Sequence, residues 1–155
     1  GHIERQAAAA AREHAEVTAE IANEIEMRGE SRLSQHLPAV AADREHPARL
    51  NHMMLVDVNH KGLSGKIAEK SLDAAGITIN RNGIPYDTRK PLDPSGIRIG
   101  TPALTTRGMK ELEMKRIAHW ICDILESPDD TNLQAKVRGE IKELCKSFPA
   151  PSELA

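Results

Sequence analysis

Residues 95–108 have the sequence SGIRIGTPALTTRG, and this stretch decides the fold class. Isoleucines flank Arg98 on both sides, and Gly96 and Gly100 bracket the three residues. Because successive side chains of a strand point to opposite faces, the alternation predicts a short strand in which Arg98 points away from the apolar face. The glycines leave room for a ligand to approach the backbone. A guanidinium can bind a carboxylate with two parallel hydrogen bonds. Arg98 is therefore either a carboxylate-binding residue or a surface or ion-pair arginine.

The elements around this strand predict an α/β (α+β) fold, in which helices pack on one short sheet. The loop between the second and third strands is long enough to be a functional element. We expect three strands, over 53–58, 77–80 and 97–99. We expect a helix over 3–28 and a second helix that Ser64 caps and Gly76 ends. Two more helices follow: a long one capped by Thr105 or Thr106 and reaching 126, and a last one with a Thr131–Gln134 capping box. Their expected core faces contain Ile67, Ala68, Leu72 and Ala75, then Met109, Leu112, Ile117, Ile121, Ile124 and Leu125, and finally Leu133, Val137, Ile141, Leu144 and Phe148.

The composition is that of a soluble globule of one domain. The chain has 155 residues, 21 Lys and Arg against 23 Asp and Glu, and only 2% aromatic residues. This charge balance argues against nucleic acid as a partner, because nucleic-acid binders usually carry a basic stripe. No run approaches the roughly 18 apolar residues that a membrane span needs, and no secretory signal follows the N-terminus. The start, Gly1-His2 without Met, is expected to be a tag remnant, and the chain a fragment.

Three motifs that invite a chemical interpretation are better explained by structure. Residues 62–66, GLSGK, lack the spacing of a phosphate-binding loop and predict a turn followed by a helix cap. The histidines show no paired spacing, so no metal site is expected. Cys122 and Cys145 have no CxxC spacing, and we expect both to be small apolar side chains in a reducing, cytoplasmic compartment.

The segment 95–108 closely resembles the C-terminal domain of serine hydroxymethyltransferase, also called glycine hydroxymethyltransferase. The resemblance extends from about residue 50 to residue 149. It is carried by several ordered motifs: NHMMLVD at 51–57, KGLSGK at 61–66, DAAGIT at 73–78 and VRGEIKELC at 137–145. It implies the small C-terminal domain of a fold-type I pyridoxal-phosphate enzyme, with a short, mostly antiparallel sheet.

The resemblance also implies an activity and two site residues. The family moves a hydroxymethyl carbon between serine and tetrahydrofolate, giving glycine and 5,10-methylenetetrahydrofolate, with pyridoxal phosphate held on a lysine. Arg98 corresponds to the arginine that binds the carboxylate of the amino-acid substrate, and Asn82 to an asparagine near the folate. Leu92 stands where an aromatic residue is common, which weakens the expected folate contact there.

The chain lacks the family's cofactor-lysine motif. Its one His-Lys pair, His60-Lys61, has no neighbouring threonines and aligns with a different loop. We therefore expect no catalytic residue, no bound cofactor and no activity in this chain alone. The expected organisation is an N-terminal helix over 1–29, a loop or insertion over 30–50 that departs from the family, a small domain over 51–149 and a tail over 150–155.

In the intact enzyme, the resemblance implies serine or glycine, tetrahydrofolate and the large domain of the same protein as partners, in a cytoplasmic homodimer. Nucleic acid and membrane are not expected partners. Two alternatives remain open. The chain could be a free-standing, non-catalytic module that binds a carboxylate or a protein partner, or a structural lid domain without binding of its own.

Overall fold

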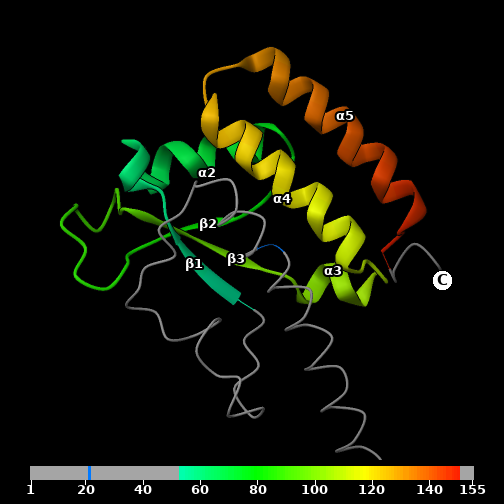
Figure 1. The fold of residues 1–155 in the computed structure, drawn as a ribbon, viewed down its shortest axis with the longest axis horizontal. Coiled ribbons are helices and arrows are strands. Elements are labelled where there is room, and N and C mark those ends of the chain that lie inside the picture. Colours follow the sequence, from blue (N-terminus) through cyan, green and yellow to red (C-terminus); the bar gives the residue numbers. More distant parts are fainter. Residues whose placement is uncertain (1–20, 22–52, 151–155) are drawn as a thin grey trace, which may run out of the picture.

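The computed structural model describes residue 21 and residues 53–150. Eight elements follow one another there (Figure 1): β1 (Met53–Asp57), the 3-10 helix η1 (Asn59–Lys61), α2 (Gly65–Ala74), β2 (Asn80–Asn82), β3 (Gly96–Gly100), α3 (Pro102–Thr106), α4 (Glu111–Glu126) and α5 (Thr131–Ser147). The expected strand over 53–58, the Ser64-capped helix and the strand around Arg98 are all confirmed.

The three strands form one antiparallel sheet in the order β1-β3-β2. In β3, Ile97 is fully buried and Ile99 is 4% exposed, whereas Arg98 is exposed. Across the sheet, Arg98 is paired with Leu55 on β1 and with Asn80 on β2. The alternation predicted from the sequence is thus confirmed, and the sheet has one apolar face and one face that carries Arg98.

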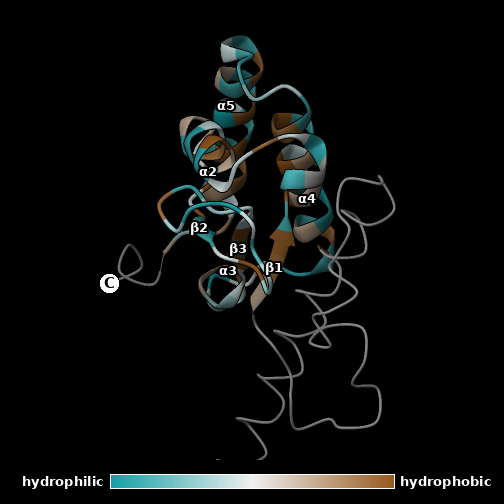
Figure 2. Ribbon diagram, turned by 90° about the vertical axis from the view of Figure 1, so that its left-hand side faces the viewer, coloured by the Kyte–Doolittle hydropathy of each residue, from teal (hydrophilic) through white to brown (hydrophobic). Residues whose placement is uncertain are grey.

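The helices α2 and α4 pack beside the apolar face of the sheet, and α5 runs alongside α4 and also contacts α2 (Figure 1). Each of these helices combines apolar and polar residues (Figure 2), and the buried apolar residues of helices and sheet form one core. The core combines Met54 and Val56 of β1, Ile97 and Ile99 of β3, Leu72 of α2, Met114, Ile121 and Ile124 of α4, and Val137 of α5.

The second strand begins later than the sequence predicted. Instead of starting a strand, Ile77 donates its backbone N–H to the carbonyl of Leu72, and Gly76, with φ 86°, donates to Asp73. This pair of bonds is the Schellman motif that closes a helix C-terminus. The expected strand over 77–80 is therefore wrong in its position, and β2 pairs only from Asn80 to Asn82.

The predicted long helix from Thr105 or Thr106 is two helices. Gly108, with φ 86°, ends α3, and the N–H of Met109 returns to the carbonyl of Leu104 in a second Schellman motif. The next helix, α4, starts after Lys110, whose N–H donates to the Glu113 carboxylate at 2.8 Å. Neither threonine caps it, so this prediction is wrong.

Three smaller expectations also fail. The N-cap of α5 is Asp130, which accepts hydrogen bonds from the N–H groups of Asn132 and Leu133, rather than Thr131. Gln134 donates to the carbonyl of Pro128 and forms no capping box. Two residues assigned to core faces, Ile67 and Leu112, are 45% and 71% exposed.

Several expectations lie outside the described residues. These are most of the helix over 1–29, of which Ile21 is described as helical and 1% exposed, together with the segment 30–50 and residues 151–155. Within the described part of the chain, no helix has the length and hydropathy needed to cross a membrane.

Candidate functional site

Arg98 lies in the middle of the central strand, on the sheet face opposite the buried isoleucines. Its Nη2 donates a long hydrogen bond, 3.5 Å, to the Asn80 side-chain oxygen on the neighbouring strand. No acidic side chain among the described residues pairs with it. Arg98 thus lies on a strand that is paired with β1 and β2, and its guanidinium forms no ion pair with a carboxylate of the described residues.

The other arginines of residues 53–150 take part in the structure. Arg81 binds Glu69 at 2.8 Å and Arg89 binds Asp93 at 2.9 Å. Each of the remaining three has a defined contact: Arg107 donates to the Phe148 carbonyl, Arg138 donates to the Ala74 carbonyl, and Arg116 lies 5.2 Å from the Trp120 ring centroid. Arg98 makes no ion pair and no side-chain hydrogen bond shorter than 3.5 Å with the described residues, which distinguishes it from an ordinary ion-pair residue.

Asn82 lies on the same sheet face as Arg98. It ends β2, pairs with Gly96, and is two residues from Asn80, the direct partner of Arg98. Such diagonal neighbours are about 7–8 Å apart, within reach of long side chains. The Asn82 side chain is half-buried and donates to the Gly83 carbonyl at 2.7 Å. The structure thus brings together the two residues that the sequence selected.

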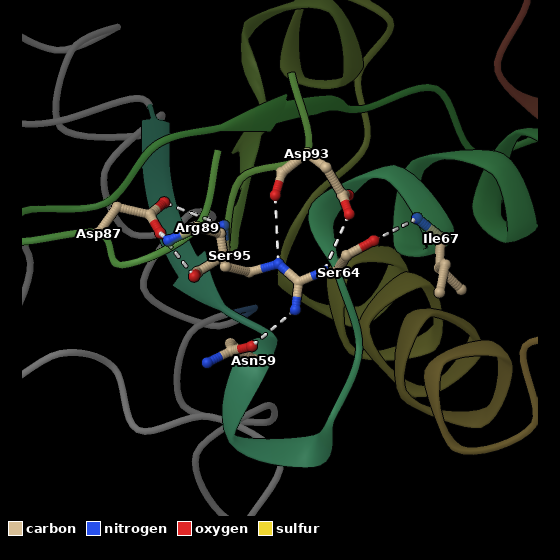
Figure 3. Close-up of polar contacts among 7 residues, drawn as sticks. All are labelled: Asn59, Ser64, Ile67, Asp87, Arg89, Asp93 and Ser95. Carbon is tan, nitrogen blue, oxygen red and sulfur yellow. Dashed lines mark hydrogen bonds and ion pairs between the residues drawn. The ribbon is translucent and has the colours of Figure 1, made fainter. Parts of the chain in front are cut away.

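The third position singled out, Leu92, lies in the loop between β2 and β3 and is 82% exposed. The loop is held to the body of the domain by Arg89, whose guanidinium donates to Asn59 on η1 at 3.2 Å and to Asp93 (Figure 3). Arg89 therefore ties the loop to η1 and to the loop's own C-terminal part.

A second anchor of this loop was missed by sequence reasoning. The Asp87 carboxylate accepts hydrogen bonds from the hydroxyl and the backbone N–H of Ser95, at 2.7 and 2.9 Å, and from the N–H group of Arg89 (Figure 3). It also accepts one from the N–H group of Ile84. Burial raises the pKa of Asp87, but these hydrogen bonds outweigh it and lower the pKa from 3.8 to about 2. The carboxylate stays ionised at any physiological pH.

The family model of serine hydroxymethyltransferase matches residues 31–121, more than half of the chain. The chain belongs to the serine hydroxymethyltransferase family. It is 59% identical over 102 residues to a serine hydroxymethyltransferase of Rhodopirellula baltica, and 57% identical over 98 residues to one of Acidobacterium capsulatum. These matches cover 66% and 63% of this chain but only 24% and 23% of the relatives, so the chain spans about a quarter of their length.

Among the described residues of this serine hydroxymethyltransferase domain, no lysine lies in a desolvated pocket that would suit covalent binding of the cofactor pyridoxal phosphate. A lysine that carries the cofactor covalently needs a desolvated pocket or a neighbouring charge that activates it. Every lysine of residues 53–150 is exposed. In the same part of the chain, no three His, Cys, Asp or Glu side chains gather into a metal site. The expectation that Cys122 is a buried small side chain is confirmed.

Proposed function

We propose that this chain is the C-terminal small domain of a serine hydroxymethyltransferase and supplies the arginine that binds the substrate carboxylate. In the intact enzyme, serine and tetrahydrofolate are interconverted with glycine and 5,10-methylenetetrahydrofolate. The observation that carries the proposal is the position of Arg98, which is exposed on the sheet face opposite the buried isoleucines and whose guanidinium has one hydrogen bond to the described residues, the 3.5 Å bond to Asn80.

The role of Arg98 follows from its chemistry. A guanidinium binds a carboxylate through two parallel hydrogen bonds, which fix both the position and the orientation of an amino acid. The central strand supports this function because β3 is paired on both sides. Asn82, on the same face, is proposed to contact the folate through its amide, and the exposed Leu92 would offer that ligand an aliphatic surface in place of an aromatic one.

The remaining parts of the proposal concern what this chain does not supply. The cofactor pyridoxal phosphate is proposed to be held by the large domain of the same protein, in a cytoplasmic homodimer. The 155-residue chain alone is then inactive. If the chain shows serine cleavage after addition of pyridoxal phosphate, this part of the proposal is wrong.

The proposed function is tested by the affinity of the intact enzyme for serine. Arg98→Ala removes the charge and the paired geometry, and Arg98→Lys keeps only the charge, so affinity should fall in the order wild type, lysine, alanine. Truncation of one partner of a desolvated charge pair costs roughly 2–5 kcal/mol. Arg116→Ala is the matched control: Arg116 lies on helix α4, outside the sheet that carries Arg98, and the variant should bind serine normally. Unchanged serine affinity in Arg98→Ala would refute the role.

A further inference from the structure

The connection between Asn82 and Arg98 is organised around one carboxylate. Asp87 accepts two hydrogen bonds at each of its oxygens: Oδ1 from the Ser95 hydroxyl and the Arg89 N–H, Oδ2 from the Ser95 N–H and the Ile84 N–H. These donors come from the beginning, the middle and the end of the loop. A single side chain therefore ties together the two ends of the segment that separates β2 from β3.

Those ends lead directly into the proposed site. Asn82 and Gly96 are paired, and a Cβ built on Gly96 would lie 2.5 Å from Ile84 Cγ2 and 2.9 Å from the Asn82 carbonyl. Side chains do not pack at such distances, so the beginning of the loop lies directly against the start of β3. A shift of the loop at Ile84 or Ser95 would be passed to the strand that carries Arg98.

The loop also contains a strained turn that Asp87 holds. The Asp87 N–H donates to the Ile84 carbonyl at 3.1 Å, with Pro85 and Tyr86 between them, and Tyr86 has φ 60°. Proline followed by a residue of positive φ is the pattern of a type II turn, whose third position favours glycine. A non-glycine residue pays about 1–2 kcal/mol there, and Tyr86, 90% exposed, has little burial to compensate.

We propose that Asp87 is a positioning residue of the substrate site. Its carboxylate stabilises the strained turn at Pro85-Tyr86 and the fold of the loop over residues 83–95, and it so fixes Arg98 relative to Asn82. The inference rests on the proposed function, because it concerns the same site. A carboxylate suits this task better than an amide. It offers acceptors only, whereas an asparagine would turn a donating NH₂ group toward two of the four N–H and O–H donors.

The test compares the intact enzyme with its Asp87→Asn variant, using Asp129→Asn in the exposed connection between α4 and α5 as the matched control. Serine affinity, kcat and thermal stability are measured for each. We expect Asp87→Asn to weaken serine binding about tenfold, because a displaced Arg98 guanidinium loses the paired geometry and weakens one of its two charge-assisted hydrogen bonds. The control should change none of the three quantities.

A rescue experiment separates positioning from general stability. In Asp87→Asn/Tyr86→Gly, glycine adopts the positive φ without strain, so the turn no longer depends on the carboxylate. Serine affinity should return to within about threefold of that of Tyr86→Gly alone, since the residual loss then reflects only the two donors that face the asparagine NH₂ group. Ser95→Ala, which removes one of the four bonds, provides a milder variant if Asp87→Asn does not fold.

The outcomes distinguish the two proposals. If Arg98→Ala loses serine affinity while Asp87→Asn or Ser95→Ala loses only thermal stability, the positioning role is refuted and the proposed function stands. Failure of the glycine variant to restore affinity would also refute the positioning role. If Arg98→Ala itself binds serine normally, the proposed function fails, and the Asp87 inference fails with it.

Discussion

The replacement Gly96→Ala is expected to disrupt the sheet at the edge of the proposed site. The new methyl group would lie 2.5 Å from Ile84 Cγ2, 2.9 Å from the Asn82 carbonyl oxygen and 3.2 Å from the Val56 carbonyl oxygen. The Ile84 side chain can rotate, but the two carbonyls belong to β2 and β1, which are hydrogen-bonded to β3 on either side. Overpacking of this kind costs about 1–3 kcal/mol.

The same substitution at Gly139 provides the control. Gly139 is exposed within α5, and a Cβ there would meet nothing within 4 Å. Alanine is favoured over glycine in a helix by about 1 kcal/mol, so Gly139→Ala should raise the free energy of unfolding while Gly96→Ala lowers it. Urea denaturation of the full chain measures both. The reasoning is refuted if Gly96→Ala loses less than about 0.5 kcal/mol, the range of an ordinary surface change.

Three further predictions concern stability. Ile121→Ala, at a side chain 1% exposed in α4, should cost about 2–5 kcal/mol in urea denaturation; a loss below about 0.5 kcal/mol would show that α4 is misoriented. Asp130→Ala should cost about 1 kcal/mol as the N-cap of α5, whereas an equal loss in Thr131→Ala would contradict the cap assignment. Folding lowers the pKa of Asp87 from 3.8 to about 2, so its stabilising effect should be complete above pH 3.8 and be lost as the pH falls through about 2. The free energies of unfolding of wild type and Asp87→Asn, measured across that range, should therefore differ less at low pH. A difference that stays constant with pH would contradict the lowered pKa.

The parts of the fold that depend on local alternation could be predicted from the sequence. The isoleucines beside Arg98 fixed the orientation of β3, and Ser64 was correctly assigned as a helix cap, accepting a hydrogen bond from the Ile67 N–H. The errors occur where backbone hydrogen bonds close a helix. Gly76 was recognised as a helix stop, but its motif also uses the amide of Ile77, which delays β2.

The anchor of the loop could not be predicted, because Asp87 acts through positions up to eight residues away. Its partner Ser95 is brought near only when β2 and β3 pair and the intervening loop folds back. The turn at Pro85-Tyr86 also lacks the glycine that would have marked a positive φ in the sequence. The only available signal was an Asp close to a Pro-rich turn, which many surface loops share.

The central claim, that Arg98 binds the substrate carboxylate, is tested most directly by comparing glycine with glycinamide as ligands of the intact enzyme. Glycinamide keeps the amino group and lacks the carboxylate. Arg98→Ala should weaken glycine binding by at least about 30-fold, equivalent to about 2 kcal/mol, and leave glycinamide binding unchanged, so that the preference for glycine disappears. If Arg98→Ala retains the wild-type preference for glycine over glycinamide, the carboxylate is bound elsewhere and the account is contradicted.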